Sequence, residues 1–324
     1  MVDPKLVDFR KGYINEPIRK GFGRGLLTLG KTNSDVVACC ADLTESTQMN
    51  LFAEAYPERF FEIGVAEQNL VTVGSGLAAG GKIPFVSSYA AFNPGRNYEQ
   101  IRTTICLNDR PVKIIGSHAG VSVGPDGATH QMLEDIVLMR ALPNMVVLSP
   151  GDSIEAEKCT IAMANDPQPN YMRLAREASA VYTTLETPFK IGQAYVYEPG
   201  EDLTIISTGA MTFQALLSID LLFKDGIDVE IIHVPTIKPL DKKTILASIT
   251  KTRACLVIEE GQIAGGLGGA VAELASEFFP IPIIRLGIQD RFGESGTPTE
   301  LLQYFGLDAN HIRLAAHKVL LNRR

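Results

Sequence analysis

The chain has 324 residues, of which 45% are apolar and 21% are charged, as in an ordinary globular protein. A formal net charge of −7 leaves no broad basic surface, which argues against a nucleic-acid partner. No apolar run reaches the roughly 20 residues that cross a bilayer, so no membrane span is expected. The charged residues at the start are not followed by an apolar stretch, which is not the pattern of a secretory signal and predicts a cytoplasmic protein.

From about residue 36, short apolar runs with strand-forming residues alternate with longer helical patterns. This alternation predicts an α/β fold with a mainly parallel sheet covered by helices on both faces. The strand-like runs are VVACCADL (36–43), PFVSSYA (84–90), VKIIGSH (112–118), MVVLSP (145–150) and YMRLA (171–175).

Two helices of this first half can be placed from their residue pattern. The run 66–81 is rich in Ala and Gly, which predicts a buried helix whose small side chains permit close packing. A second helix is expected to begin near Thr129 and His130 and to continue through 131–142.

The apolar periodicity lapses over 176–202, where Thr, Pro and Gly become frequent. We place a domain boundary there, which divides the chain into domains 1–185 and 186–324. Alternation then resumes, with expected strands at 203–209, 229–235, 254–261 and 281–287 and helices at 211–226, 242–250 and 268–279. The second half is therefore expected to be another, smaller α/β domain.

The cysteines do not form a recognisable site. No two of them have CxxC spacing, and no cluster of His and Cys has the spacing of a zinc site. We therefore expect buried free thiols and no metal ligand in this chain. The five residues are Cys39, Cys40, Cys106, Cys159 and Cys255.

A glycine-rich segment, GSHAGVSVGPDGATHQ (116–131), directly follows an expected strand. In an open α/β sheet, ligands bind in the crevice at such strand ends. His118 and His130, two of only five histidines, lie in this segment. A neutral imidazole can bind sugar hydroxyls or transfer protons, whereas a histidinium suits a phosphate group. The alternative is a surface loop without a ligand.

Glu67 lies at an expected junction between a loop and a helix and is flanked by apolar and small residues. Burial there would favour its protonated form and allow it to share a proton. The alternative is a glutamate that only stabilises the start of a helix. Nearby, Tyr89 and Phe92 are three residues apart, and such a pair either flanks a flat heteroaromatic ring or packs in the core.

A second glycine cluster, IEEGQIAGGLGGAVAEL (258–274), follows an expected strand and opens a helix. Its spacing is not the G-x-G-x-x-G dinucleotide fingerprint. Glu259 and Glu260 would also repel a diphosphate. We interpret the cluster as structural, allowing tight packing between strand and helix.

Several of these segments resemble the transketolase family. The run SHAGVSVGPDGATHQ (117–131) is similar to the family's segment with His, a glycine-rich run, Asp-Gly and Thr-His-Gln. ADLTESTQMN (41–50) and FFEIGVAEQN (60–69) resemble two further segments, the second of which carries the family's cofactor-activating glutamate. RLAR (173–176) and FGESGTPTELLQYFGL (292–307) extend the resemblance over nearly the whole chain.

The resemblance implies a pyrimidine-binding domain for thiamin diphosphate, followed by a transketolase C-terminal domain. Glu67 would hydrogen-bond the aminopyrimidine ring nitrogen and promote the imino form that removes the proton from the thiazolium carbon, after which the cofactor carries the covalent chemistry. Tyr89 and Phe92 would bracket the pyrimidine. Asp42 would lie near the cofactor at a subunit junction.

The resemblance also implies a sugar-phosphate site. His118 and His130 would contact sugar hydroxyls and assist proton transfer, and Asp126 would bind the hydroxyl next to the reacting carbon. Arg176, and with it Arg173, would bind the phosphate, for which a guanidinium is well shaped. The implied reaction transfers a two-carbon ketol unit between a ketose phosphate and an aldose phosphate, as in the non-oxidative pentose phosphate pathway.

One motif of the family is absent. Transketolases hold magnesium and the diphosphate through Gly-Asp-Gly followed by Asn, and the nearest strings here are GPDG at 124–127 and GDS at 151–153. The resemblance therefore implies the C-terminal half of a split transketolase, with magnesium bound by an N-terminal, diphosphate-binding partner subunit. It also implies self-association of this chain into the dimer core of a heterotetramer, with contacts from the second domain.

Three alternatives stay open. Half of a 1-deoxy-D-xylulose-5-phosphate synthase shares the GVAEQ run, but that family usually has an Asp-Arg pair where this chain has Ser117 and His118. The beta subunit of a pyruvate-dehydrogenase-type enzyme has a different loop. A non-catalytic subunit of the same fold is the third alternative, because fold alone does not establish activity.

Overall fold

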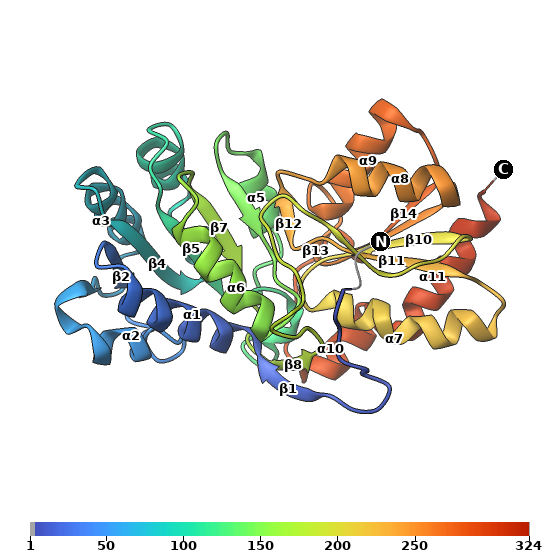
Figure 1. Cartoon of the computed structure of the whole chain (residues 1–324), viewed down its shortest axis with the longest axis horizontal. Coiled ribbons are helices and arrows are strands. Elements are labelled where there is room, and N and C mark those ends of the chain that lie inside the picture. The colour runs from blue at the N-terminus through green and yellow to red at the C-terminus, as the bar shows by residue number, and fades with distance from the viewer. Residues whose placement is uncertain (1–3, 324) are drawn as a thin grey trace.

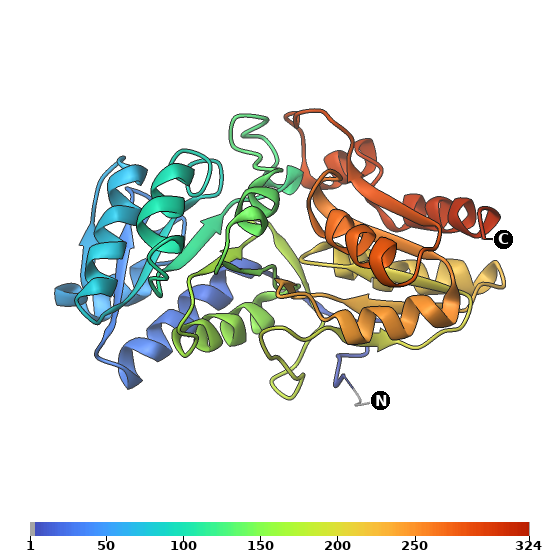
Figure 2. The same cartoon turned by 90° about the horizontal axis from the view of Figure 1, so that it is seen from above.

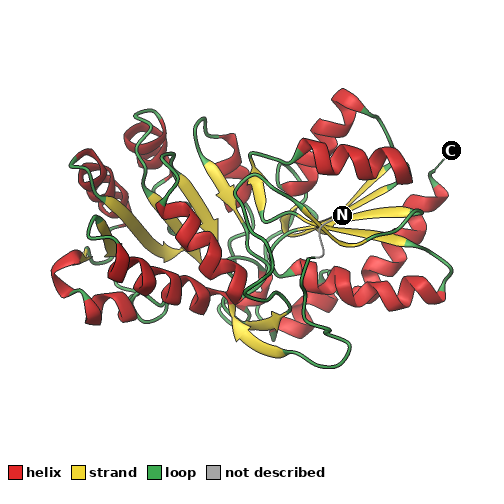
Figure 3. Ribbon diagram, viewed as in Figure 1, coloured by secondary structure: helices red, strands yellow, loops and turns green. Residues whose placement is uncertain are grey.

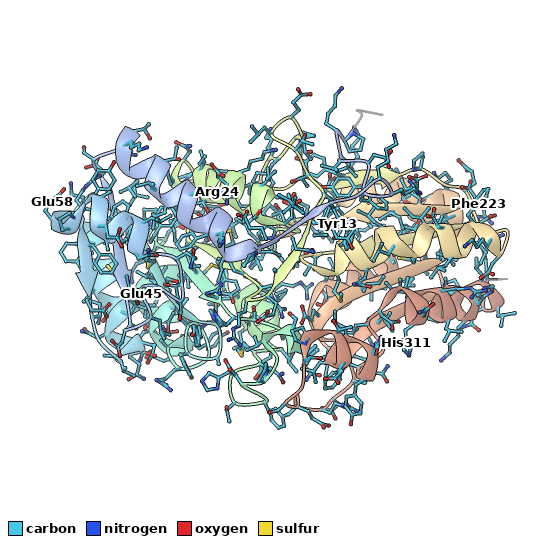
Figure 4. The ribbon with its side chains drawn as sticks, turned by 90° about the horizontal axis from the view of Figure 1, so that it is seen from below. Tyr13, Arg24, Glu45, Glu58, Phe223 and His311 are labelled. Atoms are coloured by element: carbon cyan, nitrogen blue, oxygen red, sulfur yellow. The ribbon has the colours of Figure 1, made fainter. Side chains whose placement is uncertain are left out.

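The computed structural model describes residues 4–323. Two sheets, each covered by helices, lie next to each other along the long axis (Figures 1 and 3). Glu58 and Phe223 mark opposite ends of this axis (Figure 4). The two α/β units confirm the predicted fold class. Within the described range, no helix is both long enough and apolar enough to cross a membrane.

The first sheet has seven strands in the order β12-β6-β7-β5-β4-β2-β3. Every neighbouring pair is parallel except β12 and β6, which run antiparallel. This confirms the mainly parallel sheet. The strands span β2 Val36–Cys40, β3 Phe60–Glu62, β4 Ile83–Tyr89, β5 Lys113–Ser117, β6 Val146–Leu148, β7 Asn170–Arg173 and β12 Thr236–Lys238.

Helices cover both faces of this sheet, as buried apolar side chains show. One face packs Phe22 and Leu26 of α1 together with Cys159 of α6. The other face packs Leu70 of α3 and Met139 of α5. The helices are α1 Ile18–Thr32, α2 Asn50–Ala55, α3 Glu67–Ala79, α4 Tyr98–Gln100, α5 Asp135–Ala141 and α6 Ser153–Ala164.

The small residues of α3 allow the close packing that the sequence predicts. A Cβ atom added at Gly74 would lie 2.7 Å from Val86 Cγ1 of β4, closer than real Cβ atoms approach a neighbour. Burial of the cysteines is also as expected, since all five are free and buried.

The helix expected from Thr129 and His130 begins later, at Asp135, so its predicted start was wrong. The preceding residues have other partners. Met132 forms a parallel bridge with Ala119, and Gln131 donates its side-chain Nε2 to the carbonyls of Val121, Gly124 and Glu294. These tertiary bonds override the local helical pattern.

The second sheet has five strands in the order β14-β13-β10-β11-β9, with β9 antiparallel to β11 and the other pairs parallel. Helices α8 and α9 cover one face, and α7 and α11 cover the other (Figure 1). The strands are β9 Tyr195–Glu198, β10 Leu203–Ser207, β11 Val229–His233, β13 Cys255–Gln262 and β14 Ile283–Ile288. The helices are α7 Met211–Lys224, α8 Lys242–Thr252, α9 Leu267–Phe278, α10 Pro298–Tyr304 and α11 Ala309–Leu321.

Seen from above, the two halves lie side by side (Figure 2), and two contacts tie them together. Strand β12 belongs to the second half of the chain but pairs with β6 of the first sheet. Near the N-terminus, β1 (Ile14–Pro17) pairs with β8 (Ala178–Val181), and Tyr13 packs edge-on against Phe213 of α7 at 4.7 Å between centroids (Figure 4). The boundary at residue 185 stays a prediction. The pairing of β12 with β6 joins residues from the two sides of it.

The glycine cluster at 258–274 serves packing. Glu259 Oε2 and Oε1 accept hydrogen bonds from the backbone nitrogens of Leu267 and Gly268 at the start of α9, each at 2.8 Å. A Cβ at Gly266 would lie 2.0 Å from Glu259 Oε2, so a residue without a side chain is needed there. The strand-to-helix junction is therefore closed by a protein carboxylate.

Candidate active site

The candidate residues gather at the carboxyl ends of the parallel strands of the first sheet. Tyr89 is the last residue of β4, His118 follows β5, and Arg176 comes shortly after β7. These strands are neighbours in the sheet, so their ends meet at one edge.

Four rings from three segments form a cluster at this edge. Tyr89 stacks on His118, with centroids 3.8 Å apart and planes inclined by 24°. His130 stands edge-on to Phe92 at 5.5 Å and to Tyr89 at 6.2 Å. The structure thus joins the two predicted histidines to the two predicted aromatic residues.

The aromatic pair has a geometry that the sequence does not reveal. Tyr89 and Phe92 lie nearly parallel, with centroids 6.1 Å apart. A ring held between two others needs about 7 Å between the outer rings, since each contact takes about 3.5 Å. The two rings are therefore closer together than a third ring between them would require.

His118 is held neutral at this site. Its side chain is only 2% exposed, and its Nδ1 lies 2.9 Å from Ser117 Oγ. Burial, followed by the charges of Arg19, Arg176 and His130, lowers the pKa of His118 to about 3. His118 therefore suits a hydroxyl better than a phosphate. No residue in the range 4–323 makes a hydrogen bond to its Nε2, which is left for a ligand.

A pair of arginines lies beside His118, and one of them was missed by sequence reasoning. Arg19 of α1 donates its Nε to the carbonyl of Arg176 at 3.3 Å and its Nη1 to the carbonyl of Ser46. Burial, followed by the charge of Arg176, lowers the pKa of Arg19. Two nearby guanidinium groups favour an anion. No local motif marks Arg19, because only the fold brings it to Arg176.

Asp126 approaches this arginine pair. Its Oδ1 lies 3.5 Å from Arg176 Nη1, which also donates to the carbonyl of Val123 at 2.9 Å. Both side chains are partly exposed, at 35% for Asp126 and 31% for Arg176. Asp126 and Arg176 are therefore together, and both remain accessible.

Arg173 is engaged elsewhere. Its side chain is 8% exposed, and Nη2 donates to the carbonyl of Glu260 at 2.5 Å. Nη1 lies 3.4 Å from Asp135 Oδ1. This guanidinium links the end of β7 to α5 and to the second domain, and its partners differ from those of Arg176.

Glu67 is the first residue of α3 and is 2% exposed. Its Oε2 accepts a hydrogen bond from Arg96 Nη1 at 2.7 Å, and the same guanidinium lies 4.5 Å from the ring centroid of Phe92. Arg96, which the sequence did not single out, therefore connects the buried carboxylate to the ring cluster. The positive end of the α3 dipole also favours a carboxylate there.

Asp42 lies at the open side of this region. It is exposed, has a φ of +59°, and its backbone nitrogen donates to Glu62 Oε1 at 2.7 Å. Two apolar side chains near it are also exposed, Phe61 at 38% and Val65 at 71%. Of these residues, Val65 lines the same cavity as Glu67.

Two family models match this chain, one in each half. Residues 17–180 match the model of the transketolase pyrimidine binding domain, and residues 192–312 match that of the transketolase C-terminal domain. A transketolase C-terminal section from Methanocaldococcus jannaschii is 44% identical over 298 residues, which cover 91% of this chain and 93% of that protein.

Two further relatives are similar over most of the chain. A 6-deoxy-6-sulfo-D-fructose transketolase subunit from a Clostridium species is 37% identical over 91% of both chains. A solved structure described as a split gene transketolase, inactive beta4 tetramer, superposes with a TM-score of 0.89 at 40% identity, covering 95% of this chain and 99% of that one. The chain thus belongs to the transketolase family and corresponds to its C-terminal section, a pyrimidine-binding domain followed by a transketolase C-terminal domain.

Proposed function

We propose that this chain supplies the pyrimidine-binding half of a thiamin-diphosphate-dependent transketolase and works with a diphosphate-binding partner subunit. One observation carries the proposal. A buried carboxylate, Glu67, lies beside an aromatic cluster that also contains neutral His118, and a pair of arginines stands next to that histidine. This arrangement provides separate places for a heteroaromatic ring, sugar hydroxyls and a phosphate.

The residues present fit the pyrimidine end of the cofactor. Glu67 Oε1 accepts no hydrogen bond from the part of the chain that the structure describes, so this oxygen is left to face a ring nitrogen. Phe92 and Tyr89 offer an apolar face beside it. When bound, the cofactor would supply the carbanion-stabilising chemistry that two-carbon transfer needs.

The same edge fits a sugar phosphate. His118 Nε2 would accept or donate to a hydroxyl, and His130, whose Nδ1 lies 2.9 Å from Thr129 Oγ1, would do the same from the other side. Asp126 would bind a hydroxyl next to the reacting carbon. Arg176 and Arg19 would bind the phosphate, and Arg173 would support the loop that carries Arg176.

The partner assignment rests on the missing diphosphate motif and on relatives of similar length. Magnesium and the diphosphate would be held by the partner subunit, as the absent Gly-Asp-Gly motif implies. The exposed residues Phe61, Val65 and Asp42 would lie at the junction. Self-association of this chain would form the centre of a heterotetramer.

The test is ketol transfer from xylulose 5-phosphate to ribose 5-phosphate with thiamin diphosphate and magnesium. The chain would be assayed alone, with a candidate diphosphate-binding subunit, and as the Glu67→Ala variant in the same mixture. We expect activity only in the wild-type mixture. Stable assembly and cofactor binding without transfer would refute the ketol-transfer assignment.

The alternatives call for other substrates in the same mixture. A deoxyxylulose-phosphate synthase half would condense pyruvate with glyceraldehyde 3-phosphate, and a non-catalytic subunit would turn over neither. A terminal sulfonate has the same tetrahedral set of acceptor oxygens as a phosphate, so 6-deoxy-6-sulfo-D-fructose belongs in the donor panel because the Clostridium relative carries that name. The neutral His118 in place of the synthase's usual Asp-Arg pair favours ketol transfer.

A further inference from the structure

The contact between Arg96 and Glu67 is a charged hydrogen bond to a buried carboxylate. Arg96 Nη1 lies 2.7 Å from Glu67 Oε2, the guanidinium is 49% exposed, and the carboxylate is 2% exposed. Of the two carboxylate oxygens, only Oε2 accepts a hydrogen bond from the described residues. No other charged side chain in residues 4–323 forms an ion pair with Glu67. A buried carboxylate without such a partner is costly, so this contact determines how the group is held.

The segment that carries Arg96 is fixed by buried amides. Asn93 Nδ2 donates to the carbonyls of Val86 and Ile115, in β4 and β5. Asn97 Nδ2 donates to the carbonyl of Glu67 at 2.9 Å and to Asn93 Oδ1 at 3.0 Å. The residues on either side of Arg96 are thereby tied to the sheet and to the first turn of α3.

The turn between these amides is tight. A Cβ at Gly95 would lie 2.2 Å from the carbonyl oxygen of Ala91, so the backbone there has no room for a side chain. The arginine therefore leaves a rigid segment directly next to Glu67, and little backbone entropy is lost when the hydrogen bond forms.

The guanidinium also covers Phe92, at 4.5 Å from its centroid. Glu67 and Arg96 both line a shallow cavity of about 480 Å³ that opens beside α3, together with Val65 and Gln100. Arg96 thus contacts the proposed proton-sharing carboxylate and one of the proposed ring-binding residues at once.

We propose that Arg96 is a positioning residue for Glu67, which holds Oε2 and thereby leaves Oε1 as the oxygen presented to the aminopyrimidine of the cofactor. This role rests on the proposed function and deepens it. Without Arg96, the carboxyl group can rotate, and the oxygen that shares a proton with the ring nitrogen is no longer oriented. Loss of Arg96 therefore weakens cofactor binding, whereas binding of the sugar is little affected because its residues lie at β5 and β7.

The experiment measures the dissociation constant of thiamin diphosphate with magnesium by calorimetry, using the complex of this chain with its diphosphate-binding subunit. Arg96→Ala and Arg96→Met should each weaken cofactor binding about tenfold, since both remove a charged hydrogen bond. Arg96→Met keeps a long side chain over Phe92, so it separates the effect of lost packing from the effect of lost charge. Arg96→Lys should restore most of the affinity.

Arg102→Ala is the matched control, because Arg102 lies six residues further along the chain in the helical turn Ile101–Cys106. It is exposed and forms no side-chain hydrogen bond or ion pair in the described structure. It should bind the cofactor like the wild type. Thermal melting and sedimentation of each complex show whether folding and assembly are kept. The KM for the donor sugar, measured at saturating cofactor, should stay within about twofold for Arg96→Lys.

The outcomes separate the two proposals. Wild-type affinity in Arg96→Met would overturn the positioning role and leave only packing. Tighter binding in Arg96→Ala would also overturn it, since Arg96 would then compete with the cofactor for Glu67. If the assembled wild-type complex did not bind the cofactor, the proposed function itself would be wrong, and the role of Arg96 with it.

Discussion

The imidazole of His118 lies 3.8 Å from the ring of Tyr89, centroid to centroid, and nearly parallel to it. The contact follows from strand register, because Tyr89 of β4 pairs with Ser117 of β5, the residue before His118. A residue proposed for the sugar therefore lies directly on a residue proposed for the cofactor. Burial in this stack is also what keeps His118 neutral.

The depressed pKa of His118 predicts a loss of stability in acid. The unfolded imidazole takes up a proton near its ordinary pKa of about 6.5, whereas the folded one, with a pKa of about 3, does not. The contribution is therefore fully present above pH 6.5 and is lost as pH falls toward 3. Between pH 7 and pH 5 the free energy of unfolding should fall by roughly 2 kcal/mol from this group.

Urea unfolding of the wild type and of His118→Asn, followed across that range, checks this expectation. The variant lacks the titrating group, so its stability should decline less steeply with falling pH. Equal slopes for the two proteins would mean that His118 titrates normally in the folded chain.

Replacing Arg176 or Arg19 with alanine should weaken binding of phosphorylated sugars. Each change removes a guanidinium from the anion site, and we expect KM for ribose 5-phosphate to rise about tenfold or more while kcat changes little. The KM for unphosphorylated ribose should stay the same. If kinetics with phosphorylated sugars were unchanged, the phosphate role of these residues would be wrong.

Two glycines of α3 should respond in opposite ways to the same substitution. Gly74→Ala places a Cβ 2.7 Å from Val86 Cγ1 and should lower the free energy of unfolding by about 1–3 kcal/mol. Gly76→Ala meets nothing within 4 Å, and should raise it by up to about 1 kcal/mol through helix propensity. Urea midpoints of the two variants give the comparison, and similar shifts would refute the tight contact between α3 and β4.

A buried hydrogen bond between the two halves should be costly to break. Glu155 Oε2 of α6 lies 2.7 Å from His233 Nε2 of β11 and also accepts a hydrogen bond from the backbone of Gly151. Glu155→Ala leaves both donors without a partner and should cost about 3 kcal/mol.

The control for that change lies on the same helix. Glu157 pairs with Arg24 at 3.0 Å, and both side chains are partly exposed, at 28% and 37%. Glu157→Ala should therefore cost less than about 1 kcal/mol. Thermal unfolding of both variants gives the comparison. Equal melting temperatures would show that Glu155 does not hold the two halves together.

Much of the fold follows from local sequence pattern. The runs around β2, β4, β5, β7, β10, β11, β13 and β14 are apolar and end at turn-forming residues, and the structure has strands there. The short strand β12 has no such signal and forms only because β6 offers an edge. The predicted start of α5 near Thr129 was wrong for the complementary reason. Gln131 and Met132 bond to residues outside their own segment.

The sequence by itself determined the fold class, the family resemblance and most of the candidate side chains, because these depend on residue type and spacing along the chain. Only the tertiary structure decided that Arg19 lies beside Arg176, that Arg96 holds Glu67, and that Arg173 bonds to Glu260. Each of these contacts joins residues far apart in the chain, and a local pattern carries no information on which donor reaches which acceptor. The neutrality of His118 was likewise decided by burial and by neighbouring charges that folding brings together.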